Sequence, residues 1–190
     1  MMHTVFSRRR FLAISALTLG GLAFNALPRT ARGAAPERTL IAYFTWSGNT
    51  RGIARLLHQK VGGDLVELEP VTPYSENYDT CLEQAKRDQE QAARPELKTR
   101  IADMGRYDTV FLGYPNWCGT MPMALWTFLE NHDFSGKTIY PFCTHEGSGV
   151  GHSLEDIHAL CPDAKLGKSL ALLGTTIEDA EDDIRRWLRD

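Results

Sequence analysis

One segment of the 190-residue chain determines its fold, Leu40-Ile-Ala-Tyr-Phe-Thr-Trp-Ser-Gly-Asn-Thr-Arg-Gly-Ile-Ala-Arg-Leu-Leu57. Residues 39–44 form an apolar run of strand length, which is typical of a parallel strand buried on both faces. A loop rich in hydroxyl groups follows at residues 45–50. An amphipathic helix comes next and ends at Gly62-Gly63. The segment therefore predicts a strand, a tight loop and a helix in succession.

The loop at residues 45–50 has the composition of a phosphate-binding site. Thr45, Ser47 and Thr50 supply hydroxyl groups, and Gly48 lets the backbone approach a ligand closely. Backbone N–H groups and the positive end of the following helix can face the same point. The loop lacks the Gly-Lys-Ser/Thr motif of nucleoside triphosphate sites, so it suits one phosphate monoester held by neutral donors. An ordinary helix cap, the alternative, needs only one such residue.

Strands and helices alternate along the rest of the chain. Further strands are predicted at residues 64–69, 109–113, 138–143 and 165–173. Helices are predicted at 79–93, 96–105, 123–131, 153–162 with a capping box at Ser153, and 176–188 with Ile177, Ala180, Ile184, Trp187 and Leu188 on the buried side. This alternation predicts one α/β domain with a parallel sheet between two layers of helices. Such folds bind ligands beyond the carboxyl ends of the strands.

Two more loops with unusual chemistry leave that end of the sheet, at residues 114–122 and 144–151. In the first of these, Trp117 could stack on a flat ring, or it could be a core residue. The second is rich in glycine and could offer backbone donors to the polar edge of such a ring. His145 and Glu146 in this loop are either a proton-handling pair or simply exposed side chains.

The N-terminal residues 1–35 predict an export signal rather than part of the fold. Ser7-Arg-Arg-Arg-Phe-Leu12 precedes a short, mildly apolar run and then small residues, and the paired arginines match a twin-arginine address. A retained membrane anchor and a disordered basic tail are the alternatives. Export would make the protein periplasmic and leave residues 36–190 as the mature domain.

The mature domain is acidic. Five of the 21 Lys and Arg residues, and none of the 24 Asp and Glu residues, lie in residues 1–35, so residues 36–190 carry a formal net charge of −8. This charge argues against nucleic acid and anionic membrane as partners, and it favours a protein with a basic docking surface.

The four cysteines show no spacing typical of a zinc site. They are Cys81, Cys118, Cys143 and Cys161. Because Cys118 and Cys143 are expected at the same end of the sheet, a disulfide between them is one alternative in an oxidising compartment. Four buried or free thiols are the expected state.

Three motifs in order resemble the FMN-binding loops of the flavodoxin family. Thr45-Trp-Ser-Gly-Asn-Thr50 resembles the FMN-phosphate loop, while Tyr114-Pro-Asn-Trp-Cys-Gly-Thr-Met-Pro122 and Pro141-Phe-Cys-Thr-His-Glu-Gly-Ser148 resemble the two loops around the isoalloxazine ring. The resemblance covers nearly all of the mature domain. It implies a flavodoxin-like three-layer sandwich, with five parallel strands in the order 2-1-3-4-5 and helices on both faces.

The resemblance also implies an FMN site and its residues. The phosphate would contact Thr45, Trp46, Ser47, Gly48, Asn49 and Thr50, and the ring would lie near Pro115, Asn116, Trp117, Cys118, Gly119, Thr144, His145, Glu146, Gly147, Ser148 and Gly149. Flavodoxins often cover the second face of the ring with another aromatic residue. None stands in the loop at 144–151, so His145, a partner or nothing would cover that face.

The expected function is electron transfer by an exported FMN protein between redox partners. Without Lys or Arg near the ring, an acidic environment would lower the reduction potential of the flavin. The first alternative is an FMN-dependent oxidoreductase that uses NAD(P)H to reduce a quinone or another small substrate. The second is a binding module that has lost the flavin, which the intact loop at residues 45–50 argues against.

Overall fold

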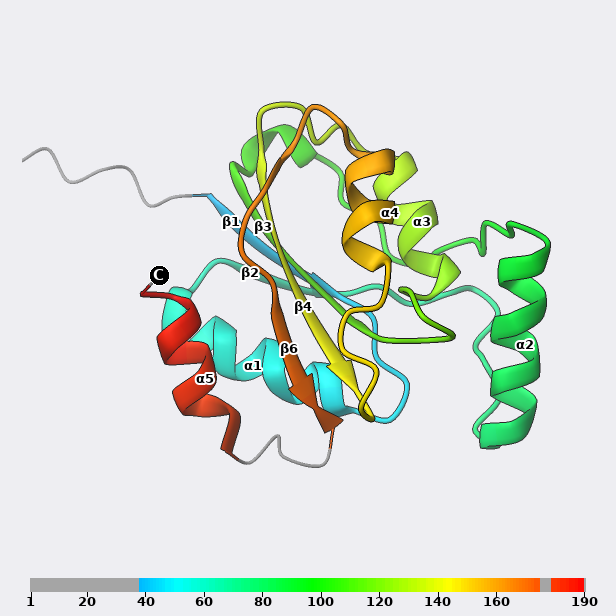
Figure 1. The fold of residues 1–190 in the computed structure, drawn as a ribbon. Coiled ribbons are helices and arrows are strands. Elements are labelled where there is room, and N and C mark those ends of the chain that lie inside the picture. The colour runs from blue at the N-terminus through cyan, green and yellow to red at the C-terminus, as the bar shows by residue number, and fades with distance from the viewer. Residues whose placement is uncertain (1–37, 175–178, 190) are drawn as a thin grey trace, which may run out of the picture. The chain divides into compact units, whose positions relative to one another are not determined.

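The structure is a computed structural model that describes residues 38–174 and 179–189 (Figure 1). The predicted export signal, residues 1–35, lies outside this range. The strands are β1 (Thr39–Tyr43), β2 (Asp64–Glu67), β3 (Thr109–Pro115), β4 (Thr138–His145), β5 (Lys165–Leu166) and β6 (Leu170–Leu173). The helices are α1 (Asn49–Val61), α2 (Tyr78–Glu90), α3 (Met123–Glu130), α4 (Ser153–Leu160) and α5 (Ala180–Trp187), and η1 (Met104–Arg106) is a 3₁₀ turn.

The strands form a parallel sheet in the order β2-β1-β3-β4-β5, and β6 also pairs with β4. This arrangement confirms the predicted fold and strand order. The α3 and α4 helices cover one face of the sheet, and α1 and α5 cover the other (Figure 1). The described helices include none that is long and apolar enough to cross a membrane.

β1 shows why the sequence begins with an unbroken apolar run. Leu40 and Ala42 belong to the core beneath α3 and α4, whereas Ile41 belongs to the core beneath α1 and α5. All five residues of β1 are buried. A strand covered by helices on both faces needs apolar side chains at successive positions, because adjacent side chains point to opposite faces.

The predicted helical piece at residues 96–105 is wrong. Only η1 forms there, because the preceding backbone bonds to another segment of the chain. The N–H of Val71 donates to the carbonyl of Glu96 (2.7 Å), and the N–H of Lys98 donates to the carbonyl of Glu69 (2.7 Å). These contacts hold the segment next to the chain that leaves β2, and an intrahelical ladder cannot form at the same time. The helix predicted at 79–93 forms as α2 and ends three residues earlier.

The single strand predicted at residues 165–173 is divided into β5 and β6. From Ile139 to Phe142 the pairing advances three residues on β4, while it advances four on the partner, from Leu166 to Leu170. The extra residue makes a bulge. Pro141 of β4 lies at this position and has no N–H to donate, so a continuous ladder would lose a bond there.

The start of α4 and the end of α5 differ from the prediction. His152, not Ser153, is the N-cap of α4, and no side-chain capping bond forms. The Ser153 hydroxyl instead donates to the carbonyl of Val150 (2.6 Å), so the predicted capping box is wrong. In α5, Ala180 and Ile184 are buried as predicted, Trp187 is partly buried, and Leu188 after the helix is exposed. Ile177 lies outside the described residues.

β3 and β4 run further than predicted, through Pro115 and His145. The connections at the carboxyl ends are therefore residues 44–48, 116–122 and 146–152, which we call the first, second and third loops. The four cysteines are free thiols, so the alternative disulfide between Cys118 and Cys143 does not form.

Candidate functional site

The three loops enclose a pocket of about 430 Å³ at the carboxyl ends of the strands, which we call the carboxyl-end pocket. Its volume lies within the ordinary range of small-molecule sites, roughly 300–1,000 Å³. The first and second loops leave β1 and β3, the neighbouring strands at which the strand order reverses. This reversal is the usual binding position in open α/β sheets. The predicted site residues that line the pocket are Trp46, Ser47, Asn49, Pro115, Asn116, Trp117, Cys118, Thr144, His145, Glu146 and Ser148.

The first loop presents unsatisfied donors. Gly48 is the N-cap of α1 and has a left-handed backbone with φ of 96°, a conformation that glycine adopts without strain. The hydroxyl oxygen of Thr45 accepts a hydrogen bond from the N–H of Gly48 (3.1 Å), so its own proton remains free to donate. The first turn of α1 contains no acidic residue. Its N–H groups have no intrahelical partners, so this helix end suits an anion.

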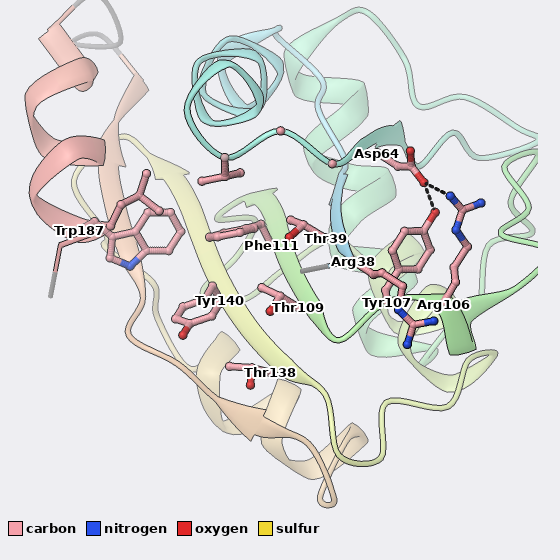
Figure 2. Close-up of a pocket in the computed structure, with 14 residues that line it drawn as sticks. Arg38, Thr39, Asp64, Arg106, Tyr107, Thr109, Phe111, Thr138, Tyr140 and Trp187 are labelled. Atoms are coloured by element: carbon pink, nitrogen blue, oxygen red, sulfur yellow. Dashed lines mark hydrogen bonds and ion pairs between the residues drawn. The ribbon is translucent and has the colours of Figure 1, made fainter. Parts of the chain in front are cut away.

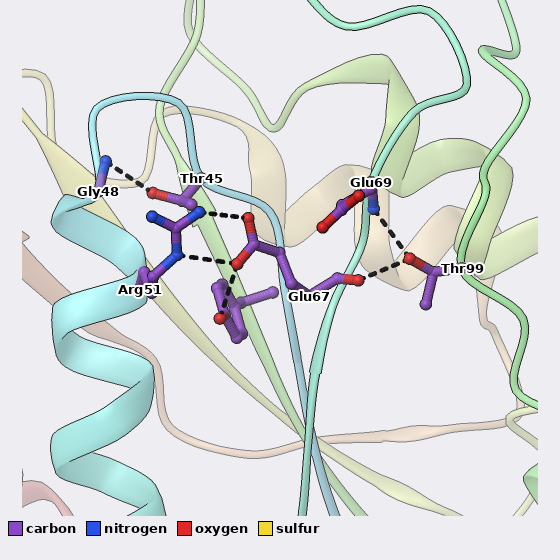
Figure 3. A network of polar contacts seen from close by, with 7 residues as sticks. Thr45, Gly48, Arg51, Glu67, Glu69 and Thr99 are labelled. Carbon is purple, nitrogen blue, oxygen red and sulfur yellow. Dashed lines mark hydrogen bonds and ion pairs between the residues drawn. The ribbon is translucent and has the colours of Figure 1, made fainter.

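Arg51 follows the first loop and is paired with Glu67 of β2. Its guanidinium makes two bonds to the Glu67 carboxylate, at 2.9 and 2.6 Å, and the Tyr43 hydroxyl donates to the same carboxylate at 2.9 Å (Figure 3). Thr99 supports the neighbouring backbone, since its hydroxyl donates to the carbonyl of Glu67 (2.6 Å). The loop therefore keeps neutral donors, as the sequence predicted.

Replacing Glu67 by Gln should reduce the fall in the free energy of unfolding that accompanies a fall in pH in the acidic range. The hydrogen bonds from Arg51 lower the pKa of Glu67 from its ordinary value, with a smaller contribution from Tyr43. A lowered pKa in the folded state stabilises the protein above the unfolded value of about 4.3, and this contribution is lost as the pH falls through the folded value. We expect Glu67→Gln to cost about 0.5–1 kcal/mol at neutral pH, because the pair is only partly buried.

Urea unfolding from about pH 6 to 3 measures this effect. Glu69→Gln is the matched control, because the structure shows no hydrogen bond or ion pair to the Glu69 carboxylate. It should keep the slope of the unmodified protein. An unchanged slope in Glu67→Gln would contradict the prediction.

A buried pair of hydroxyl groups joins α1 to β4. The Oγ1 atoms of Thr50 and Thr144 lie 2.8 Å apart, and both residues are almost fully buried. A hydroxyl has one proton, so Thr50 can donate to a ligand only when Thr144 donates to Thr50. The phosphate contact predicted for Thr50 therefore requires this one orientation of the pair.

Replacing either threonine by valine should lower the free energy of unfolding by more than half of the loss caused by replacing both. Thr50→Val or Thr144→Val leaves the other hydroxyl buried without a partner, at a cost of about 1–2 kcal/mol. The double variant removes both polar groups, so its loss should be smaller than the sum. The free energy of unfolding of all four proteins gives the coupling between them. Additivity within about 0.3 kcal/mol would show that the pair is not coupled.

Trp117 of the second loop is half-buried and has edge contacts on its inner side. Its ring lies 5.3 Å from Phe44 and 4.9 Å from Tyr74, at angles of 81° and 90°. Gln89 of α2 donates to its carbonyl (2.9 Å). These contacts fix the ring while it also lines the pocket. Trp117 thus combines core packing and a position at the pocket, which the sequence had left as alternatives.

Asn116 joins the second loop to the third. Its amide donates to the carbonyl of Gly149 (2.7 Å), its backbone N–H donates to the carbonyl of Thr144 (2.8 Å), and its side-chain oxygen accepts from the N–H of Gly119 (3.0 Å). Gly151 lets the two loops approach closely, because a Cβ there would lie 1.9 Å from the carbonyl oxygen of Gly119. The two sides of the pocket are therefore built as one unit.

The third loop uses His145 structurally. Nδ1 of His145 accepts a hydrogen bond from the N–H of Gly147 (2.9 Å), and the structure shows no hydrogen bond between His145 and Glu146. The two residues therefore do not form the proton-handling pair considered from the sequence. Burial raises the pKa of the neighbouring Cys143 thiol to about 12, so this thiol is inert at neutral pH.

One wall of the pocket was not predicted. The apolar face of α2 lines it with Tyr78, Cys81, Leu82 and Ala85. Their spacing follows one face of a helix, but the charged residues of α2 led us to expect only a solvated surface. Trp46 packs beside Tyr78, with ring centroids 6.2 Å apart, and its indole N–H donates to the carbonyl of Ser75 (2.8 Å). The structure therefore supplies aromatic residues that the third loop lacks.

Six predicted residues do not line the carboxyl-end pocket. They are Thr45, Gly48, Thr50, Gly119, Gly147 and Gly149. Thr45 lines an adjoining hollow of about 510 Å³ on the β2 side, together with Trp46 and Ser47. Gly119, Gly147 and Gly149 have positive φ values, so they shape the backbone of the second and third loops without lining the pocket.

A larger hollow of about 830 Å³ lies at the opposite, amino ends of the strands, and we call it the amino-end pocket (Figure 2). Phe111 and Tyr140 stack there with centroids 5.3 Å apart. Its two arginines are paired, Arg106 with Asp64 and Arg38 with Asp108, each at 3.2 Å. None of the predicted site residues lines this pocket.

The carboxyl-end pocket has no cationic Lys or Arg among its lining residues, and Glu146 is its one carboxylate. The described residues contain no cluster of His, Cys, Asp and Glu that could hold a metal ion. The site therefore offers aromatic surfaces, hydroxyl and amide groups and a helix N-terminus.

Comparisons with known proteins agree with the observed fold. The model of the flavodoxin family matches residues 38–190. The chain is similar to the crystal structure of a proposed flavoprotein from Bacteroides eggerthii, with 32% identity and a TM-score of 0.71 over 80% of this chain and 96% of that chain. A proposed flavoprotein from Bacteroides uniformis shows 27% identity and a TM-score of 0.69 over 80% and 98%.

A third structure, a flavoprotein in complex with FMN from Lactobacillus acidophilus, has 21% identity and a TM-score of 0.63 over 80% of this chain and 99% of that chain. At this identity the likeness shows a shared fold. No curated protein sequence matches the chain.

Proposed function

Because the chain belongs to the flavodoxin family, we propose that it is an exported protein that carries electrons between redox partners. Its cofactor is FMN, as expected from the sequence. FMN supplies the redox chemistry, since its ring accepts and releases electrons. The protein supplies the binding site, the orientation of the ring and the electrostatic environment.

The main support for this proposal is that the groups lining the carboxyl-end pocket match the chemistry of FMN. The N-terminus of α1 and the hydroxyl of Ser47 suit a phosphate monoester, and Thr45 offers a free proton from the adjoining hollow. Trp117, Trp46 and Tyr78 give flat surfaces for an aromatic ring. Among the residues that line the pocket, Glu146 is the only one with a negative charge, which would repel a phosphate.

The electrostatics of the pocket favour electron transfer at low potential. No Lys or Arg lines it, and the nearest arginine after the first loop is neutralised by Glu67. Reduction of the flavin adds electrons to the ring, and a site without cationic partners stabilises that added charge poorly. A low reduction potential is the expected property of the bound flavin.

Export by the twin-arginine route is the proposal for the segment before the described residues. The arginines at 8–10, the short apolar run and the small residues near 33–35 support it. Replacing Arg8 and Arg9 by Lys should leave the protein inside the cell, as measured by fractionation and immunoblotting. Recovery in the membrane fraction would indicate a retained anchor instead.

The proposed partner is a protein with a basic docking surface. The formal net charge of −8 on residues 36–190 supports this choice. Electron transfer to such a partner should slow as the salt concentration rises, because salt screens the attraction. A rate that is independent of ionic strength from about 20 to 500 mM would contradict a docking surface of this kind.

Anaerobic reduction of the purified protein tests the function. A yellow protein that releases FMN on denaturation is expected, and NAD(P)H alone should leave its absorbance unchanged for minutes. A flavodoxin reductase with NADPH should then bleach it. A protein that is reduced by NAD(P)H and passes electrons to a quinone unaided would be an oxidoreductase, and a colourless protein that rejects FMN would overturn both flavin functions.

A further inference from the structure

Two thiols line the carboxyl-end pocket from different elements. Cys81 belongs to α2, and Cys118 lies in the second loop. Cys81 is 4% exposed, whereas Cys118 is exposed to solvent. The other two cysteines, Cys143 and Cys161, are buried and do not line this pocket. The structure thus brings together one accessible and one sheltered thiol.

A hydrogen bond already joins α2 to the second loop. The amide of Gln89 in α2 donates to the carbonyl of Trp117 at 2.9 Å, and Trp117 is the residue before Cys118. Burial raises the pKa of Cys81, and charge on Cys118 raises it further. Both side chains line the same pocket of about 430 Å³, so the two thiols share one cavity.

Cys118 carries a side chain where glycine would be favoured. Its φ of 51° is left-handed, and the following Gly119 has φ of 92°. A side chain in this conformation is strained unless the surroundings hold it. The loop keeps a thiol at this position and exposes it at the mouth of the pocket.

We propose that Cys81 and Cys118 form a reversible disulfide that ties α2 to the second loop beside the pocket. A low-molecular-weight disulfide such as oxidised glutathione is the oxidant. The thiolate of Cys118 attacks it, forms a mixed disulfide and releases one glutathione thiolate. The thiolate of Cys81 then attacks the sulfur of Cys118 and releases the second. Two protein S–H bonds are lost, one S–S bond forms, and two glutathione thiols are produced.

The bond would hold an element that is otherwise weakly attached. Only Cys81 and Ala85 of α2 are buried, and α2 lies to the side of the two helical layers (Figure 1). Its other attachments include the edge contact of Tyr78 with Trp46 and hydrogen bonds through Gln84, Asp88 and Gln89. The carboxylate of Asp88 accepts from the Tyr74 hydroxyl (2.8 Å). Elements with few buried contacts open most readily, so the disulfide should restrict opening of this wall.

The first experiment detects the bond itself and does not require FMN. The reduced full-length protein is treated with oxidised glutathione, and its mass and peptides are analysed without reduction. We expect loss of two hydrogens, about 2 Da, a fall from four titratable thiols to two, and a peptide that links Cys81 to Cys118. The thermal midpoint should rise by roughly 5–10 °C.

Variants make the test specific. Cys118→Ser and Cys81→Ser should abolish the linked peptide and the thermal shift, while Cys161→Ser, away from the pocket, should retain both. A stable glutathione adduct on Cys118, a dimer linked through Cys118, or full retention of four thiols would overturn the proposal.

The second experiment concerns the pocket and rests on the proposed function. Oxidation should slow the release of FMN at least about fivefold in the unmodified protein, and not in Cys118→Ser. If the bond forms and FMN release is unchanged, the disulfide does not restrict the pocket. If the protein binds no FMN, the linked peptide still decides whether the bond exists, so the two proposals fail separately.

Discussion

Replacing Gly151 by Ala should destabilise the protein by roughly 3–5 kcal/mol and weaken FMN binding at least about 30-fold. The new Cβ would lie 1.9 Å from the carbonyl oxygen of Gly119, so the second and third loops must separate. The φ of 58° adds a backbone cost. Urea unfolding and FMN fluorescence titration measure the two losses.

Gly149→Ala isolates the steric part of this effect. Gly149 has nearly the same backbone conformation, with φ of 61°, and a Cβ there meets nothing within 4 Å. Its cost should be the backbone strain alone, about 1–2 kcal/mol. Equal losses in the two variants would show that the close approach of the loops is not what holds them together.

Replacing Trp117 by Ala should raise the dissociation constant of FMN roughly 10- to 100-fold. Stacking of a flat heterocycle on an aromatic side chain is worth about 1–3 kcal/mol. The variant also loses the edge contacts with Phe44 and Tyr74, so stability should fall by about 2 kcal/mol. FMN titration and urea unfolding of the same preparation separate the two effects.

Two controls define the role of the ring. Trp117→Phe keeps a ring at the pocket, and we expect its dissociation constant to stay within about fivefold of the original. Trp126→Phe changes a tryptophan of α3 that is outside the pocket and whose buried N–H has no hydrogen-bond partner in the structure. It should leave FMN binding unchanged. Unaltered affinity in Trp117→Ala would show that this ring does not stack on the flavin.

Local patterns in the sequence were sufficient to predict most of the fold. The apolar run of β1 and the glycines after α1 act over a few residues, and both elements form as expected. The order of the strands followed from the family resemblance. The helix predicted at residues 96–105 was wrong because the backbone of Glu96 and Lys98 bonds to residues 69–71, and no local pattern reports a distant partner. The split between β5 and β6 depends in the same way on Pro141 of a neighbouring strand.

The candidate site was predictable to the extent that it lies on loops. The pairing of Thr50 with Thr144 joins residues 94 positions apart, so it could be seen only in the structure. The wall formed by α2 had a signal, the helical spacing of Tyr78, Cys81, Leu82 and Ala85. That signal was obscured because most other residues of the helix are charged or polar. Its neighbours in space come from loops far away in sequence.

The direction of β1 has a practical consequence for any experiment that immobilises the protein. The described residues begin at Arg38, which lines the amino-end pocket. From there β1 runs to the first loop at the opposite end of the strands. Five residues of strand span about 17 Å. A tag or surface joined directly at Arg38 is therefore at the edge opposite the carboxyl-end pocket. Attachment at Arg38 should leave the carboxyl-end pocket open to an electrode or a soluble partner, whereas attachment through α2 would block it.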